Sequence, residues 1–326
     1  MKAIVYTKYG PPDVLQLKEI EKTTPNDDEV LIKVQAASAN AADWHDMRGK
    51  PFFIRLMGGG LLKPKNKRLG IDIAGRIEAV GRNVKQFRPG DEVFGFSQGG
   101  FAEYVCAHEN SLALKPTSTT FEEAAAIPVA AVTALQGLRD KGKIQPGQKV
   151  LINGASGGVG TFAVQIAKSF GTEVTAVCST RNLDMVRSIG ADQVIDYTQE
   201  DFTKSGQRYD LILAVNGYHP ISAYKRALSS KGIYVMAGGT MAQFFQVMFL
   251  GPWISMTGSK KMGFMGVAKP NKEDLDYLKE LFEAGKVAPV IDRHYTLSEV
   301  AEAIRYLEEG HAKGKVVITV EHNNKA

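Results

Sequence analysis

Asn153-Gly154-Ala155-Ser156-Gly157-Gly158-Val159-Gly160 is the stretch that decides the fold of this chain. It follows an apolar run over 149–152 that predicts a buried strand, and it precedes residues 161–170, whose apolar side chains recur at helical spacing. A dinucleotide-binding fingerprint requires a strand before its glycine-rich turn and a helix after it. An ordinary glycine-rich turn, the alternative interpretation, does not require these neighbours. Glycine lets the backbone approach a pyrophosphate, and the amides at the helix start hold the anion. The turn therefore predicts nucleotide contacts from Ser156, Gly157, Gly158, Val159 and Gly160.

The composition is that of an ordinary globular protein. The 326 residues, 44% hydrophobic and 23% charged, suit about two domains. A net charge of +5, with acids and bases interspersed, indicates no nucleic-acid partner. No apolar run is long enough for stable membrane insertion, the first ten residues read as a strand rather than a signal peptide, and the two cysteines are too few for a disulfide framework. We therefore expect a soluble, cytoplasmic protein.

The first third of the chain reads as β-structure, and its glycines suit the corners of a small barrel. Strand composition recurs over short stretches: 3–6, 14–20, 30–37, 70–81, 91–96 and 101–107. Thr120 and Glu123 then form a capping box, which predicts a helix that is interrupted near Pro128. From residue 148 strands and helices alternate, so we expect a parallel sheet covered on both faces.

The alternation predicts short strands over 173–178, 194–196, 209–215 and 232–237, with helices over 185–189 and 222–228 between them. Asn271 and Ser298 are the expected caps of two later helices, over 274–284 and 300–308. A final strand over 315–320 follows the nucleotide domain and is expected to return to the barrel. The predicted fold is thus α/β: a Rossmann domain over 120–289 inserted in a β-barrel domain made of 1–119 and 290–326.

Residues 241–265 are apolar with few charges, and two interpretations stay open. The segment is either a buried helix followed by a loop, or an apolar wall over a substrate pocket or a subunit contact. It lacks the basic face of a helix that binds a membrane surface.

The second strand of the alternating region ends in Ser179-Thr180-Arg181 rather than in an acid. An acid at this position binds the ribose hydroxyl of NAD, whereas a permanently charged arginine suits the phosphate of NADP. The tip therefore predicts NADPH, the alternative being an exposed arginine that starts a helix. Further ligand contacts are expected where later strands end, at Asn216, Gly238 and Gly239.

The chain resembles the medium-chain dehydrogenase/reductase superfamily over nearly its whole length. The resemblance rests on Gly-Asp-Glu-Val at 90–93, Ala-Ser-Gly-Gly-Val-Gly at 155–160, Gly-Ala-Asp at 190–192 and Gly-Lys-Val-Val at 314–317. It is similar to the quinone oxidoreductase branch, and residues 179–192 particularly resemble plant enone oxidoreductases, which reduce α,β-unsaturated carbonyl compounds with NADPH. This resemblance implies a GroES-like barrel and a homodimer joined at edge strands, with a candidate edge strand near 248–257.

The resemblance also implies that no metal takes part. Zinc alcohol dehydrogenases place a cysteine where this chain has Asn40, and a His-Glu pair where it has Ile71-Asp72. The two cysteines cannot supply a structural zinc lobe, and the six histidines form no short-spaced cluster. We therefore expect a zinc-independent reductase that transfers hydride to a quinone or to the β-carbon of an enone.

The resemblance assigns roles to individual residues. It places Asn40 beside the nicotinamide, where its amide could donate to the substrate carbonyl or to the coenzyme ribose, the alternative being a structural turn residue. Trp44 and Arg48 are implied to line the substrate pocket.

Three more residues match coenzyme contacts of the family: Thr133, Tyr197 and Lys315. The residues identify no proton donor and do not separate quinone from enone chemistry. The alternative function is a nucleotide-binding homologue without turnover, acting as a sensor or a structural protein.

Overall fold

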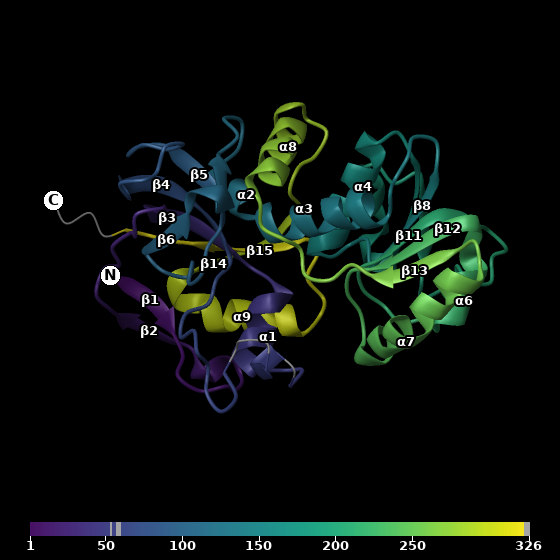
Figure 1. Ribbon diagram of the computed structural model, residues 1–326, viewed down its shortest axis with the longest axis horizontal. Coiled ribbons are helices and arrows are strands. Elements are labelled where there is room, and N and C mark those ends of the chain that lie inside the picture. The colour runs from purple at the N-terminus through teal and green to yellow at the C-terminus, as the bar shows by residue number, and fades with distance from the viewer. Residues whose placement is uncertain (53, 57–59, 323–326) are drawn as a thin grey trace. The chain divides into compact units, whose positions relative to one another are not determined.

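The computed structural model describes residues 1–52, 54–56 and 60–322, which group into two compact units (Figure 1). Unit 1 comprises Met1–Val129, Pro270–Glu283 and Pro289–Ala326, and unit 2 comprises Ala130–Lys269 and Ala284–Ala288. The boundaries expected from the sequence differ from this division, because residues 120–129 and 270–283 group with unit 1.

Contacts explain that difference. The helix α2 (Phe121–Ala125) packs on strands β3 (Glu29–Ala39) and β4 (Asp72–Val80), and the helix α8 (Lys272–Glu283) packs on β7 (Leu112–Leu114). Both helices begin with the caps that the sequence predicts. Thr120 and Glu123 form the capping box of α2, and the Asn271 side chain accepts from the Asp274 amide at 2.8 Å.

Unit 1 is built on a seven-stranded sheet in the order β14-β15-β3-β4-β5-β7, with β6 paired to β3. A separate antiparallel pair, β1 and β2, accompanies it. The remaining strands of this unit are β1 (Lys2–Val5), β2 (Gln16–Glu19), β5 (Glu92–Phe96), β6 (Tyr104–His108), β14 (Ile291–Thr296) and β15 (Lys315–Thr319). Register shifts in the pairing of β3 with β4 let the long β3 serve several partners, as a strongly curved sheet requires.

The core of unit 1 lies where alternate residues of β3, namely Val30, Ile32 and Val34, meet Ile73 and Val316. All five side chains are fully buried, and each such burial contributes about 1.5–3 kcal/mol. The helices α1 (Ala41–Arg48) and α9 (Val300–Glu308) pack together and against this core (Figure 1).

The final strand returns to the first domain as the sequence predicts. β15 runs antiparallel to β3, with Val316 opposite Ala39 and Val317 opposite Ser38. This pairing closes unit 1 from both ends of the chain and places the start of β15 beside the end of β3.

Unit 2 is a parallel six-stranded sheet in the order β10-β9-β8-β11-β12-β13. Its elements are β8 (Lys149–Asn153), β9 (Glu173–Cys178), β10 (Gln193–Asp196), β11 (Tyr209–Ala214), β12 (Leu228–Met236) and β13 (Lys261–Phe264), with α3 (Pro128–Leu135), α4 (Gly158–Ser169), α5 (Leu183–Ser188), α6 (Ile221–Ala227) and α7 (Met241–Thr257). In Figure 1, α4 covers one face of the sheet and α6 and α7 cover the other. The strand order reverses between β8 and β11, where such sheets bind ligands at the carboxyl ends of their strands. The doubly wound fold is confirmed.

The segment 241–265 departs from the first of its two interpretations, a buried helix followed by a loop. It forms α7, whose Thr240 side chain accepts from the Gln243 amide, followed by β13. Phe249, Trp253 and Met256 are 75%, 64% and 86% exposed, so α7 is not a buried helix. The edge strand expected near 248–257 is wrong, because that stretch lies within α7, which is capped at Thr240 and continues through Pro252, and β13 is the terminal strand of the sheet. No described helix has the length and apolarity that a bilayer crossing requires.

A second correction concerns the start of α9. Thr296, not Ser298, makes the cap, because Thr296 and Glu299 form a capping box around a short 3₁₀ turn over Leu297–Glu299. That turn extends the helical region backwards, so Ser298 lies within it.

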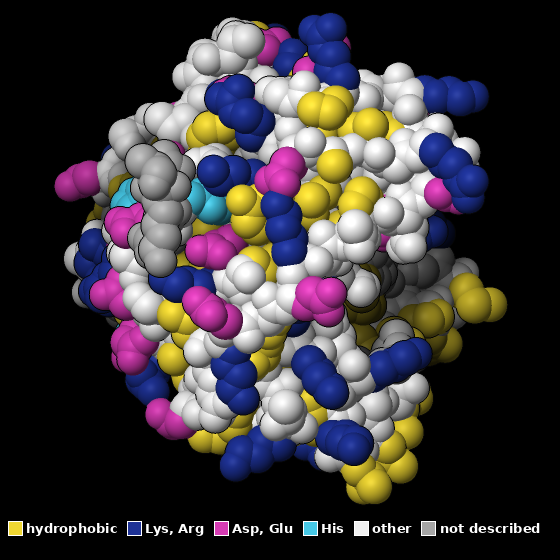
Figure 2. Space-filling view, turned by 90° about the vertical axis from the view of Figure 1, so that its left-hand side faces the viewer, with side chains coloured by type: hydrophobic (Ala, Val, Ile, Leu, Met, Phe, Trp, Pro, Cys, Tyr) yellow, Lys and Arg dark blue, Asp and Glu magenta, His cyan; other side chains and the backbone are white. Residues whose placement is uncertain are grey.

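On the face that Figure 2 shows, acidic and basic side chains are interspersed over most of the surface. Charges of opposite sign therefore largely offset one another on that face.

Candidate active site and nucleotide site

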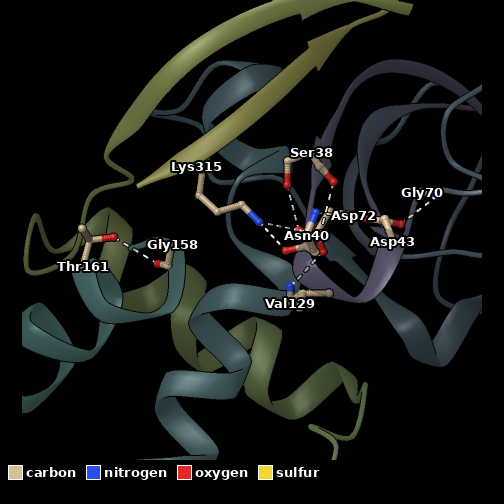
Figure 3. Close-up of polar contacts among 9 residues, drawn as sticks. All are labelled: Ser38, Asn40, Asp43, Gly70, Asp72, Val129, Gly158, Thr161 and Lys315. Atoms are coloured by element: carbon tan, nitrogen blue, oxygen red, sulfur yellow. Dashed lines mark hydrogen bonds and ion pairs between the residues drawn. The ribbon is translucent and has the colours of Figure 1, made fainter. Parts of the chain in front are cut away.

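Unit 1 contains a buried polar cluster formed by Ser38, Asn40, Asp72 and Lys315 (Figure 3). The sheet register assembles it: Ser38 lies opposite Asp72 in the β3–β4 pair, and β15 begins with Lys315 beside the end of β3. Asn40 follows β3 directly as the N-cap of α1. The four side chains therefore converge because three strands end or begin at one place.

Asp72 is the centre of this cluster and is fully buried. Its Oδ2 atom accepts from Ser38 Oγ at 2.8 Å, from Asn40 Nδ2 at 2.9 Å and from Lys315 Nζ at 3.1 Å. Its Oδ1 atom accepts from the Val129 amide at the start of α3, at 2.8 Å. A buried carboxylate is tolerated only with such hydrogen bonds and a paired cation, so Asp72 and Lys315 depend on each other.

Asn40 has all of its amide atoms engaged within the cluster. Its Nδ2 group donates to Asp72 and, at 3.3 Å, to the carbonyl of Ser38, and its Oδ1 atom accepts from Lys315 Nζ at 2.6 Å. A lysine ammonium can only donate, so this contact fixes which end of the amide faces it.

Asp43 adds a second buried carboxyl at the start of α1. Its carboxylate accepts from the backbone amide of Asn40 at 2.8 Å and from the backbone amide of Gly70 at 3.0 Å. The pKa of Asp43 is raised to about 7: burial is the largest cause and the charge of Asp72 adds to it, whereas the two backbone donors and the charge of Lys315 oppose the rise. Asp43 thus ties the helix that carries Asn40 to the loop before β4.

The two residues expected to line a substrate pocket have other partners in unit 1. Arg48 makes a bidentate ion pair with Glu308 of α9, at 2.6 and 2.8 Å. Trp44 stacks on His45 with ring centroids 3.6 Å apart and packs against the core of unit 1. The structure brings Lys315 to Asn40, whereas the contacts of Arg48 join α1 to α9.

In unit 2 the predicted glycine turn lies between β8 and α4, at the start of that helix. The N-cap of α4, Gly157, offers no side-chain cap to the first amides of the helix. A Cβ at Gly160 would come within 2.1 Å of the Gly154 carbonyl, so the turn itself requires glycine there. A Cβ at Gly157 would meet nothing closer than 3.9 Å, which leaves room beside the amides for a ligand.

Asn182, which the sequence analysis did not single out, contacts two of the predicted coenzyme residues. It is buried, and its Nδ2 group donates to Ser156 Oγ at 3.0 Å and to Ser179 Oγ at 3.2 Å. Because both serine oxygens act as acceptors toward Asn182, their hydroxyl hydrogens can be donated to a ligand. An asparagine just after a strand tip that carries hydroxyls was the available signal.

The tip of β9 lies beside an acid, contrary to the view from the sequence. Asp196 ends β10 directly opposite Cys178, and its carboxylate accepts from Thr180 Oγ1. The hydrogen bond from Thr180 holds the pKa of Asp196 below its usual range. The sequence showed no acid at the tip of β9, and only the strand pairing reveals the acid at the end of its neighbour β10. Arg181 and Tyr197 are exposed next to this pair.

The remaining predicted coenzyme residues lie at strand ends of unit 2 or on α3. The Asn216 amide donates to the Asn153 carbonyl at 3.2 Å, which places it against the glycine turn. The Gly238 amide donates to the Ala214 carbonyl at 3.2 Å, so the ends of β11 and β12 meet. Gly239 adopts a φ of +133°, and Thr133 lies on α3.

Two parts of the chain match known protein families. Residues 26–117 match the alcohol dehydrogenase GroES-like domain, and residues 189–318 match the family described as zinc-binding dehydrogenase. The chain is 36% identical to the chloroplastic quinone-oxidoreductase QR1 of Triphysaria versicolor, over 98% of both chains. It is 35% identical to the chloroplastic NADPH-dependent alkenal/one oxidoreductase of Arabidopsis thaliana, over 98% of this chain and 79% of that one.

The chain belongs to the quinone and enone oxidoreductase branch of the medium-chain dehydrogenase/reductases. Among solved structures, the quinone oxidoreductase of Coxiella burnetii superposes with a TM-score of 0.87 at 31% identity, over 98% of this chain and 99% of that one. Membership makes this medium-chain reductase an oxidoreductase that depends on a nucleotide and acts on small molecules.

The cytoplasmic location expected from the sequence is wrong. The names of several relatives of this medium-chain reductase place them in chloroplasts or mitochondria. The strand-like pattern of the first ten residues therefore did not predict the cellular compartment.

The zinc named in one matching family does not fit the residues present. No group of three or more His, Cys, Asp or Glu side chains that could hold a metal occurs among residues 1–52, 54–56 and 60–322. At Asp72 both carboxylate oxygens already accept hydrogen bonds, and the ammonium of Lys315 would repel a second cation.

Proposed function

We propose that the protein is a metal-free, NADPH-dependent reductase that transfers hydride to the β-carbon of an α,β-unsaturated carbonyl compound or to a quinone. The observation that carries this proposal is the buried cluster of Ser38, Asn40, Asp72 and Lys315, in which the one carboxylate is paired with a lysine rather than grouped with other metal-ligating side chains of the described residues. The names of two relatives, an alkenal/one oxidoreductase that uses NADPH and a quinone oxidoreductase, support the same chemistry.

Unit 2 is proposed to hold the coenzyme, which supplies the hydride when bound. The amides over 157–160 would take the pyrophosphate, and the hydroxyls of Ser156 and Ser179, held by Asn182, would donate to phosphate oxygens. Arg181 would pair with the ribose phosphate, opposed by the nearby charge of Asp196. The other proposed coenzyme contacts are Thr133, Tyr197, Asn216, Gly238 and Gly239.

Unit 1 is proposed to serve the acceptor. When hydride reaches the β-carbon, negative charge develops on the carbonyl oxygen, and donors already in place stabilise it most effectively because they need no reorganisation. The buried cluster contains a lysine ammonium, held in place by its partners and almost fully buried. Orientation of the two reactants supplies a further part of the rate, about 7–11 kcal/mol in favourable cases.

A panel of acceptors under NADPH tests the proposal, with product identification and metal analysis of the pure protein. The expected result is consumption of NADPH with a short enone and formation of the saturated ketone, or with a quinone and formation of the hydroquinone. A saturated ketone and a simple alcohol serve as controls and should not react. Coenzyme binding without turnover of any acceptor would instead favour a nucleotide-binding homologue that does not catalyse.

We also propose a homodimer that forms at the β13 edge of unit 2. Among the described strands β13 pairs with β12 alone, so the other side of its backbone has no strand partner there, and the neighbouring α7 exposes large apolar side chains. An open edge beside an apolar surface is a typical subunit contact.

A further inference from the structure

The hydrogen bonds of the buried cluster show which donor can reach an acceptor molecule. Asn40 is the residue that the family resemblance places at the substrate, yet both hydrogens of its amide are already donated, to Ser38 and to Asp72. An added hydrogen bond from Asn40 to a carbonyl would break one of these two. The hydroxyl of Ser38 is likewise donated to Asp72.

Lys315 differs from the other members of the cluster. Its ammonium carries three N–H donors, and the described residues accept two of them, through Asn40 Oδ1 and Asp72 Oδ2. The third has no partner among the described residues. The side chain is 3% exposed, so this remaining donor lies in a site nearly closed to water.

We propose that Lys315 donates the hydrogen bond that stabilises the acceptor oxygen, and that Asn40 and Asp72 are positioning residues for its ammonium. This inference rests on the proposed function. It reassigns Lys315 from a coenzyme contact to a catalytic residue, and Asn40 from a substrate donor to a residue that acts through Lys315.

The step balances with the hydride donor, the acceptor and one water molecule. The hydride brings its electron pair to the β-carbon, and the π electrons of the C=C bond move to form a C=C bond between the α-carbon and the carbonyl carbon. The carbonyl oxygen takes the negative charge and accepts the third N–H of Lys315. A proton from water then adds to the α-carbon, and Lys315 keeps all of its protons throughout.

Electrostatics explains why an ammonium suits this position. A hydrogen bond from a charged donor to an oxyanion is stronger than one from a neutral amide, and its strength grows as the charge develops. Asp72 keeps the ammonium in place, because an unpaired buried cation is too costly to hold.

The test uses Lys315→Met, which keeps an unbranched side chain one atom shorter and removes its donors, with Lys313→Met as the matched control nearby on the same segment. NADPH affinity is measured by titration without acceptor, and kcat is measured with a weakly activated enone and with a strongly activated quinone. Lys315→Met should lower kcat on the enone about 100-fold or more, as loss of one oxyanion donor does. It should lower kcat on the quinone less and leave the NADPH affinity unchanged, while Lys313→Met changes none of these.

A double variant guards against misfolding. Lys315→Met alone leaves Asp72 buried without its cation, so Lys315→Met/Asp72→Asn removes both charges and its melting temperature is compared with that of the single variant. A folded double variant that stays slow on the enone supports the proposal. One that recovers wild-type kcat would overturn it, as would a single variant that weakens NADPH binding without lowering kcat.

Asn40→Ala tests the positioning role. It should lower kcat on the enone and raise the KM for that enone little, because the lost contact belongs to Lys315 rather than to the substrate. A raised KM at unchanged kcat would return Asn40 to direct substrate contact and contradict the inference. A wild-type protein that reduces no acceptor ends the proposed function and this inference together, whereas an active wild type with unaffected variants ends the inference alone.

Discussion

Individual carboxyl groups in this protein take different charge states because their surroundings differ. Asp43 is fully buried and has a pKa raised to about 7, whereas Asp196 lies at the surface with a lowered pKa. Desolvation dominates the first, and hydrogen bonds to the charged form dominate the second. Each environment makes a separate prediction.

The pH dependence of stability should carry the signature of Asp43. Its folded pKa is about 7 against an ordinary value of 3.8, so between about pH 4 and pH 7 the folded state binds a proton that the unfolded state has lost. Its contribution to the free energy of unfolding is complete below pH 4, declines as the pH rises toward 7, and is lost above. Asp43→Asn should remove this decline, which urea unfolding across that range would measure. If the free energy of unfolding of the wild type and of Asp43→Asn changed with pH in parallel, the raised pKa of Asp43 would be contradicted.

Coenzyme preference should respond in opposite directions to two changes at the tip of β9. Arg181→Ala should weaken NADPH binding about tenfold relative to NADH, because a charged hydrogen bond to phosphate is worth about 1.5–3 kcal/mol. Asp196→Asn should shift the preference toward NADPH, because it removes a like charge beside the phosphate. Titration of each variant with both coenzymes checks this, and equal responses of the two coenzymes would exclude a phosphate site here.

Asn182 should matter for binding and not for chemistry. Asn182→Leu removes the donor that orients Ser156 and Ser179, so the Kd for NADPH should rise about tenfold, the equivalent of one hydrogen bond or roughly 1.4 kcal/mol. With saturating coenzyme kcat should be unchanged, and a large fall in kcat would show that the two serines have another role.

At the scale of elements, local patterns predicted most of the secondary structure. The strand β9 was predicted with its observed bounds, and the capping box at Thr120 was predicted with both of its hydrogen bonds. For α7, a helix was one of two interpretations left open, but its exposure was not predicted, because an apolar run looks the same whether its side chains meet the core or the surface. The buried cluster escaped prediction for a different reason. Asp72 had meaning in the sequence only as a missing metal ligand, and the β3–β4 and β3–β15 registers that give it partners join residues far apart in the chain.

Two glycines of one turn should separate folding from binding. Gly160→Ala places a Cβ within 2.1 Å of the Gly154 carbonyl and should destabilise the fold by about 1–3 kcal/mol. Gly157→Ala meets nothing closer than 3.9 Å and should leave the melting temperature unchanged, yet weaken NADPH binding because the methyl group occupies ligand space. Full NADPH affinity in Gly157→Ala would place the pyrophosphate elsewhere.

At the scale of the whole molecule, the chain leaves unit 1, builds unit 2 and comes back. The match of the barrel region to the GroES-like family and the Rossmann order of the sheet confirm the fold predicted from the glycine turn. The domain boundaries and the subunit contact depend on packing between distant segments, and local sequence patterns carry little information about such packing.

Assembly should depend on the exposed face of α7. Trp253→Glu introduces a charge in the middle of its apolar surface and should convert a dimer to a monomer, as light scattering after size-exclusion chromatography would measure. Leu62→Glu, the same kind of exchange at an exposed apolar residue of unit 1, is the control and should leave the mass unchanged. A wild-type protein of monomeric mass would refute the proposed dimer directly.

The pairing of β15 with β3 has a consequence for biosynthesis. Lys315 is translated 275 residues after Asn40, its hydrogen-bond partner. A nascent chain can therefore complete the whole parallel sheet of unit 2 before Lys315, the cation that pairs with Asp72, has been synthesised. Under the proposed mechanism, a chain whose translation stops before residue 315 would bind NADPH without reducing an acceptor.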